Sequence, residues 1–172
     1  MMATPSDKLS RLRGMLGKVA DTATVGGISI IGSAGEFLAE RLLDELKLAW
    51  IKTVQDQNVY SAVLRDTVKA SRPDYIVKLD DDNIFIDAKN LSRTTDNGGT
   101  IGFSIGCCER DRLIEAEKYF GLSVIILVWD RSDSDFTYAF SVPSEFTSSK
   151  IVMNRPCYEA LFETGAFHQL KL

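Results

Sequence analysis

The sequence predicts a mixed α/β domain in which helices cover a central sheet. Apolar residues recur at helical spacing in several segments, and short apolar runs of strand length lie between them. The predicted core order is helix, three strands, helix, strand, which is typical of a layered α/β fold. A chain of 172 residues suits one domain with a sizeable core. We therefore expect a single domain over residues 1–172.

Residues 6–20 are predicted as the first helix. Its apolar stripe recurs at helical spacing and consists of Leu9, Leu12, Leu16 and Val19. Basic side chains surround this stripe. Two interpretations remain open, namely a packed amphipathic helix with a solvated basic face and an arm that contacts phosphate groups.

A second helix is expected from about Ala34 to Ile51. Its buried stripe consists of Ala39, Leu42, Leu43, Leu46 and Trp50. Ser33 and Glu36 form an S-x-x-E capping box at its start. At about 100° per residue, Glu36 lies at the edge of the core face. Capping alone is a sufficient structural reason for this acid.

A strand is expected at 59–65, followed by a β-hairpin. Two apolar runs, 75–79 and 84–86, flank a cluster of three aspartates and one asparagine, which is typical of a hairpin turn. With the turn centred on residues 81 and 82, Asp74 lies opposite Lys89. Because side chains alternate along a strand, Asp74, Asp87 and Lys89 then share one face.

Opposed Cβ atoms in a hairpin lie roughly 5 Å apart, so both carboxylates reach one hard cation with an amine beside them. A turn one residue longer or shorter would place Asp74 on the other face. The alternative is a simply solvated charged face. Phe85 shares the face of Asp87 and Lys89, which argues against simple solvation.

The second half of the chain begins with a polar segment, 90–106, which we expect to be a loop. A third helix is predicted at 107–120 and ends before Gly121. Residues 123–129 are almost entirely apolar, as expected for a strand buried on both faces. Further on, a strand at 136–142, a short helix at 158–165 and a tail at 170–172 are expected.

Composition excludes several classes of protein. The formal charge of −4 argues against coating nucleic acid by bulk charge, although a local basic groove stays compatible with it. The longest strongly apolar run, 124–129, is too short to span a bilayer, so no membrane association is expected. Three cysteines, two of them adjacent, show neither a disulfide framework nor zinc spacing, which favours a cytoplasmic location. His168 is the only histidine and is expected to be a tail residue, which disfavours histidine metal sites and a Ser-His-Asp triad.

Four segments together resemble the PD-(D/E)XK nuclease superfamily, in particular the archaeal-type Holliday junction resolvases. They are GSAGEFLAERLLDE at 32–45, RPDYIV at 72–77, IFIDAKN at 84–90 and ERDRLIEAEKYFGLSVIILVW at 109–129. The resemblance covers about residues 30–130 and implies a restriction-endonuclease-like core: helix, three-stranded antiparallel meander, helix, strand. Residues 1–29 and 131–172 would be extensions of that core.

The resemblance also implies roles for single residues. Glu36, Asp74 and Asp87 would be metal ligands together with the carbonyl of Ala88, and Lys89 would orient water or stabilise developing charge. The implied cofactor is Mg²⁺, with Mn²⁺ as its substitute, and the implied assembly is a homodimer on DNA that is branched in the family. Two features depart from the family: the net charge is acidic, and the helix at 107–120 offers no Gln or Lys assignable to the auxiliary catalytic position.

The leading hypothesis is therefore a magnesium-dependent DNA endonuclease that hydrolyses phosphodiester bonds, and a structure-specific, Holliday junction resolvase-like enzyme is one form of it. Magnesium prefers carboxylate, carbonyl and water oxygens and lowers the pKa of a bound water. A restriction or repair nuclease on the same core is a second interpretation. A catalytically silent nucleic-acid-binding module is a third, and the intact Asp74, Asp87 and Lys89 argue against it.

Overall fold

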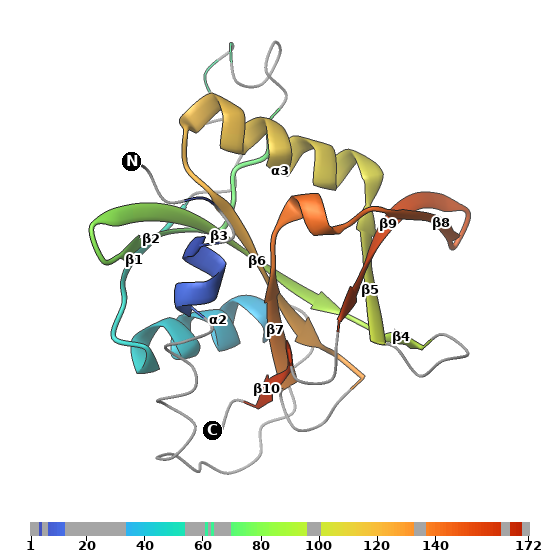
Figure 1. The fold of residues 1–172 in the computed structure, drawn as a ribbon, viewed down its shortest axis with the longest axis horizontal. Coiled ribbons are helices and arrows are strands. Elements are labelled where there is room, and N and C mark those ends of the chain that lie inside the picture. The colour runs from blue at the N-terminus through green and yellow to red at the C-terminus, as the bar shows by residue number, and fades with distance from the viewer. Residues whose placement is uncertain are drawn as a thin grey trace.

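The described part of the chain folds into two sheets and two longer helices (Figure 1). The computed structural model describes residue 4 and residues 7–12, 34–53, 61, 63, 70–95, 101–132, 137–162 and 166–169. The helices are α2 (Ala34–Glu45) and α3 (Cys107–Phe120), with a short 3₁₀ turn, η3 (Pro143–Glu145).

The central sheet has six strands and holds the candidate site. In spatial order they are β1 (Ala49–Lys52), β2 (Tyr75–Leu79), β3 (Asp82–Leu91), β6 (Val124–Asp130), β7 (Thr137–Ser141) and β10 (His168–Gln169). β3 and β6 are parallel and are connected through α3, whereas the other neighbours are antiparallel. Parallel neighbours need such a crossover connection.

The second sheet is antiparallel and uses much of the C-terminal extension. Its strands, in spatial order, are β4 (Thr94–Thr95), β5 (Ile101–Gly106), β9 (Arg155–Phe162) and β8 (Ser148–Val152). It contributes Phe103, Ala160 and Phe162 to the core that also contains Leu113 of α3.

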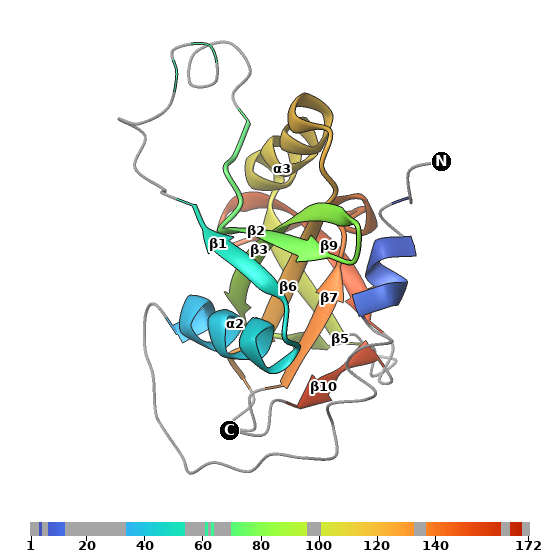
Figure 2. The ribbon, with the colours of Figure 1, turned by 90° about the vertical axis from the view of Figure 1, so that its left-hand side faces the viewer.

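Two hydrophobic cores lie on the two faces of the central sheet. α2 packs with residues 7–12 on one face, and α3 packs with the second sheet on the other. Figure 2 shows α2 and α3 on opposite sides of the strands. β3 serves both cores, because Ile84 and Ile86 point to the first while Phe85 points to the second. The prediction of a mixed α/β fold with helices covering a sheet is confirmed.

The helical residues 7–12 support the packed interpretation of the first helix. Leu9 and Leu12 are buried in the first core. Lys8 Nζ lies 3.6 Å from Asp82 Oδ2, and an Arg11 nitrogen lies 3.4 Å from Asp80 Oδ2. The basic residues thus contact the aspartates of the hairpin turn. The remainder of the predicted helix, residues 13–20, lies outside the described residues, as does Ser33 of the predicted capping box.

The second predicted helix is too long. α2 ends at Glu45, and Lys47 adopts a positive φ of 55°. The chain reverses there and returns as β1, so that Trp50 packs edge-on against Tyr75 at 5.6 Å. The spacing of Leu46 and Trp50 fits a helical stripe. In the structure Leu46 lies in the turn after α2 and Trp50 lies in β1, and both side chains still pack in the first core.

The first strand of the meander is therefore β1 and not residues 59–65. Of that segment, only Ser61 and Val63 are described, and neither lies in a strand. β1, β2 and β3 form the antiparallel meander. The meander is confirmed, with a strand about ten residues earlier than predicted.

Three further predictions are wrong. The segment 90–106 is not a loop, because β3 continues to Leu91 and the chain goes on to form β4 and β5. Of the helix expected at 158–165, residues 158–162 belong to β9, in which Tyr158, Ala160 and Phe162 alternate toward the core, and residues 163–165 lie outside the described residues. His168 was expected to be a tail residue, but it lies in β10 and pairs with Tyr138 of β7 in the central sheet. Residues 170–172 lie outside the described residues.

The third helix and the strand after it follow the prediction. α3 spans Cys107–Phe120, and Gly121 takes a left-handed conformation with φ 65°. β6 is buried along its whole length. No described helix is long and apolar enough to cross a membrane.

Candidate active site

The candidate site lies where β3 continues past Tyr75, the first residue of β2. The observed pairing joins Leu79 to Asp82 and Tyr75 to Ile86, so the turn centres on residues 80 and 81. The predicted register is thus wrong by two residues along the partner strand. Because a shift of two residues leaves every side chain on its face, the predicted face of Asp87 and Lys89 is unchanged.

Asp74 immediately precedes β2 and bonds to the exposed edge of β3. Its Oδ2 accepts a hydrogen bond of 2.8 Å from the N–H of Ala88. The opposite edge of β3 pairs with β6 at this level, with Ala88 beside Leu127. Since the N–H and C=O of one residue point to the same side of an extended strand, the carbonyl of Ala88 also points toward Asp74.

Lys89 links the hairpin to α3. Its Nζ lies 2.8 Å from Asp87 Oδ2 and 2.7 Å from Glu109 Oε1 in the first turn of α3. Lys89 keeps 21% of its side-chain surface exposed, whereas Asp87 keeps 5%. The lysine therefore covers a nearly buried carboxylate and presents its ammonium group near the surface.

Burial of these charges shifts their pKa values. Desolvation raises the pKa of Asp87 to about 7, against the attraction of Lys89 and with further raising by Asp74 and Glu109. Desolvation also raises the pKa of Asp74, opposed by the Ala88 N–H bond and by Lys89. Burial works against the charged form of Lys89, but Asp87 and Glu109 outweigh it and raise the pKa of the lysine. Two acids with raised pKa values beside one lysine are typical of functional sites.

Glu36 lies in the first turn of α2 with its carboxylate on Lys52 of β1. Lys52 Nζ is 2.7 Å from Glu36 Oε2 and 2.9 Å from Glu40 Oε1. Hydrogen bonds to these two acids raise the pKa of Lys52 to about 12. The hydroxyl of Tyr75 donates to the main-chain oxygen of Glu36, 3.1 Å away, which fixes the start of α2 over the sheet.

The start of α2 approaches β3 closely. A Cβ on Gly35 would lie 3.3 Å from Asn90 Cβ and 3.7 Å from Trp129 Cδ1. A glycine at this position lets α2 approach the sheet, so that Glu36 lies near Asp74. The negative charge of Glu36 in fact raises the pKa of Asp74, and the charge of Lys52 lowers it.

The donor set fits a hard divalent cation. Asp74, Asp87 and the Ala88 carbonyl carry oxygen atoms, the type of ligand that Mg²⁺ prefers. Asp87 Oδ2 is buried beside Lys89, and within the described ranges it makes no hydrogen bond of standard geometry. No group of three or more His, Cys, Asp or Glu side chains among the described residues is arranged to hold a metal. Glu36, the predicted third acid, contacts Lys52 instead.

Sequence reasoning missed three residues of this site. Glu40 follows Glu36 by one helical turn, and that i, i+4 spacing is visible in the sequence. Glu109 starts the predicted third helix, but its approach to Lys89 depends on how α3 packs. Lys52 was missed because β1 was predicted as helix.

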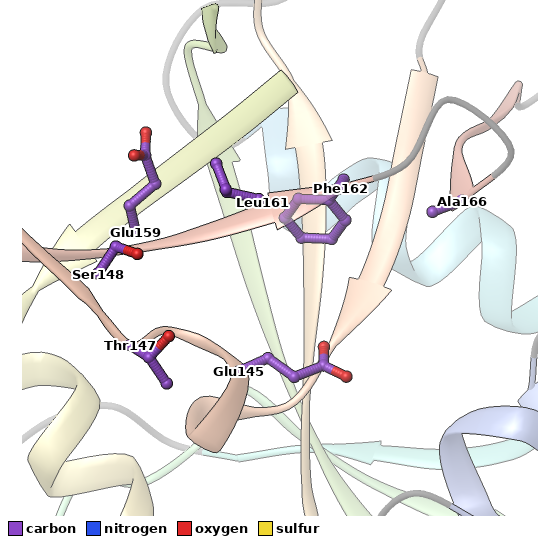
Figure 3. A pocket seen from close by; sticks show the side chains of 7 residues that line it. All are labelled: Glu145, Thr147, Ser148, Glu159, Leu161, Phe162 and Ala166. Atoms are coloured by element: carbon purple, nitrogen blue, oxygen red, sulfur yellow. The ribbon is translucent and has the colours of Figure 1, made fainter. Parts of the chain in front are cut away.

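A pocket also lies at the junction of η3 with the second sheet (Figure 3). Its lining residues are Glu145, Thr147, Ser148, Glu159, Leu161, Phe162 and Ala166. None of these is a candidate site residue. The pocket and the acids of the hairpin therefore belong to different parts of the fold.

The fold is similar to that of a protein of known structure. The Holliday junction resolvase Hjc from Archaeoglobus fulgidus matches with a TM-score of 0.50 over 78% of this chain and 90% of that chain, at 11% sequence identity. This likeness establishes the fold. A nuclease from a fusselovirus matches with a TM-score of 0.45 over 84% of this chain and 90% of that chain, at 12% identity. No protein-family model and no curated protein sequence matches the chain. The resolvase-like fold expected from the sequence motifs is confirmed.

Proposed function

We propose that this protein is a magnesium-dependent endodeoxyribonuclease that hydrolyses phosphodiester bonds. The observation that carries the proposal is that Asp74, Asp87 and Lys89 come together where β3 continues past its pairing with β2. Asp74 bonds to the amide of Ala88, and Asp87 pairs with Lys89. This arrangement lies on a fold shared with an archaeal Holliday junction resolvase.

The residues divide the work of hydrolysis between binding and charge stabilisation. Asp74, Asp87 and the Ala88 carbonyl would hold the cation, which polarises the phosphate and lowers the pKa of water. Lys89 supplies a compact positive charge that engages water or a phosphate oxygen. Glu36 would join this set if it were released from Lys52.

Branched DNA is the proposed substrate and a homodimer the proposed assembly. Both parts of the proposal come from the resemblance to the resolvases. Two sites at a fixed separation would cut symmetric strands of a junction in pairs.

A second candidate function has one observation in its favour. Lys52 and Lys89 already neutralise acids of the site, as in a structural network of ion pairs. A catalytically silent nucleic-acid-binding module on the same fold would keep such pairs without using a metal.

A cleavage assay separates these functions. Supercoiled plasmid, single-stranded DNA and a four-way junction are each incubated with the protein in Mg²⁺, in Mn²⁺ and in chelator. We expect metal-dependent cleavage, with the junction cut faster than its linear arms, and no cleavage by Asp87→Ala. Cleavage of plasmid or single strands in preference to the junction would favour a restriction or repair nuclease. Binding of DNA without cleavage in either metal would favour the silent module.

A further inference from the structure

Lys52 occupies a distinctive position at the end of the edge strand β1. In the β1–β2 ladder it lies opposite Tyr75, and the next residue, Thr53, donates its N–H to the carbonyl of Asp74 at 2.8 Å. Its ammonium group lies 6.0 Å from the centre of the Tyr75 ring. Lys52 is therefore next to Asp74 in space although it is 22 positions away in sequence.

The same ammonium group holds the carboxylate that the proposed metal site needs. Nζ of Lys52 lies 2.7 Å from Glu36 and 2.9 Å from Glu40. A divalent cation bound by Asp74 and Asp87 would recruit Glu36 only if this ion pair opened. The ammonium group of Lys52 and the divalent metal ion would thus compete for the carboxylate of Glu36.

Exposure shows which of the two lysines near the acids is able to move. Lys52 keeps 47% of its side-chain surface exposed and Glu36 keeps 40%, against 21% for Lys89. Lys52 can therefore leave Glu36 for solvent without disturbing either core. Lys89 is enclosed between Asp87 and Glu109.

We propose that Lys52 is a built-in counter-ion that competes with the catalytic cation for Glu36 and thereby sets the metal affinity of the site. This inference rests on the proposed nuclease function and names a residue that controls it. In the metal-free protein Lys52 offsets the repulsion among the acids. With the cation bound, Lys52 would release Glu36.

The test is direct Mn²⁺ binding to the full chain without DNA, measured by titration calorimetry and by the loss of the free-ion EPR signal. Lys52→Met removes the charge and keeps much of the side-chain length. We expect Lys52→Met to bind Mn²⁺ about tenfold more tightly, because a positive charge beside a carboxylate typically shifts its pKa by about one unit or more, and one unit corresponds to a tenfold change in affinity. Lys52→Arg should stay within about twofold of wild type, because it keeps the charge.

The matched control is Lys78→Met on the neighbouring strand β2. Lys78 is exposed, and its ammonium group donates to the carbonyl of Asp81, 2.6 Å away. This variant changes net charge by the same amount and should leave Mn²⁺ affinity nearly unchanged. An equal gain in Lys78→Met would overturn the proposal, because net charge alone would then account for the effect.

A double-variant cycle tests whether Lys52 acts through Glu36. In a Glu36→Gln background, Lys52→Met should no longer tighten Mn²⁺ binding. A gain of the same size in both backgrounds would overturn the proposal. If Lys52→Met does not fold, Lys52→Gln replaces it in every arm.

The outcomes separate this inference from the proposed function. If wild-type protein binds Mn²⁺ and cuts DNA but Lys52→Met binds it no more tightly, the inference is wrong and the function stands. If no variant binds Mn²⁺ and none cuts DNA, both are wrong.

Discussion

At the scale of single residues, Asp87 is a carboxylate in a buried environment that favours its neutral form or its pairing with a cation. It is almost fully buried, and its pKa is raised from 3.8 to about 7, chiefly by desolvation. An acid of this kind destabilises the metal-free fold when it ionises. The destabilisation is acceptable when a cation is the intended partner.

The raised pKa of Asp87 makes the stability of the fold depend on pH. Because the folded pKa of Asp87 exceeds its unfolded value, the folded state holds more protons between about pH 4 and 7. The contribution of Asp87 to stability is thus fully present below about pH 4 and is lost as pH rises through 7. Asp87→Asn lacks this titration and should be more stable than wild type at pH 8 in chelator, on the order of 1–3 kcal/mol.

Denaturant unfolding of both proteins at several pH values measures that difference. Only the difference between the two proteins reports on Asp87, because the pKa values of Glu45 and Glu117 are also raised. Adding Mg²⁺ at pH 8 should recover stability in the wild type and not in Asp87→Asn. A difference that does not change with pH would contradict the assignment.

Lys89 leads to a prediction about chemistry. Lys89→Ala removes the charge that we propose stabilises the developing negative charge on the phosphate, so cleavage should fall by about 100-fold or more, of the order seen when one such stabilising group is lost. Binding to DNA should weaken only slightly, because one positive charge near the phosphates is lost. Asp87→Ala should also abolish cleavage, yet its metal-free binding should hold or tighten.

Single-turnover cleavage and gel-shift titrations at one fixed salt concentration provide both readouts. Wild-type cleavage by Asp87→Ala in Mg²⁺ would exclude this site as the nuclease centre. Equal binding losses in Asp87→Ala and Lys89→Ala would point to unfolding instead of chemistry, so circular dichroism accompanies each titration.

At the scale of elements, the site depends on how α3 is held against β3. The first turn of α3 brings Glu109 within 2.7 Å of Lys89. The helix ends at Phe120, and the next residue, Gly121, donates its N–H to the carbonyl of Glu117 at 2.9 Å. Gly121 has φ 65°, and a Cβ there would meet nothing within 4 Å. The requirement for glycine is thus conformational and not a matter of space.

Gly121→Ala should therefore destabilise the protein by about 1 kcal/mol, the typical cost of a left-handed conformation for a residue with a Cβ. Gly106→Ala is the matched control, because Gly106 has an ordinary φ of −61° and a Cβ there would lie 3.9 Å from its nearest neighbour. Thermal and urea unfolding should show the larger loss for Gly121→Ala. The opposite order would mean that the end of α3 is not held in this way.

At the scale of the whole molecule, the proposed homodimer leads to a prediction about assembly. Light scattering and sedimentation at increasing protein concentration, with and without a four-way junction, measure the assembly. We expect twice the chain mass of 19.1 kDa. A particle of 19.1 kDa under every condition would rule out paired cutting by a stable dimer.

Local patterns in the sequence determined the parts of the protein that depend on near neighbours. The third helix with its glycine stop, the buried strand 124–130 and the shared face of Asp87 and Lys89 all follow from the spacing of apolar residues or from the two-residue repeat of a strand. That repeat also explains why a hairpin register wrong by two residues still predicted the correct face.

Only the tertiary structure decided which distant segments meet. The stripe that includes Leu46 and Trp50 fits a helix locally, but packing against Tyr75 makes it a turn and the strand β1. β9 likewise becomes a strand because it pairs with β5 and β8. Glu109 reaches Lys89, and Lys52 reaches Glu36, through contacts between different elements that no local sequence pattern displays. Long-range packing overrides local propensity, because burying a shared core contributes more free energy than any single segment gains from its preferred conformation.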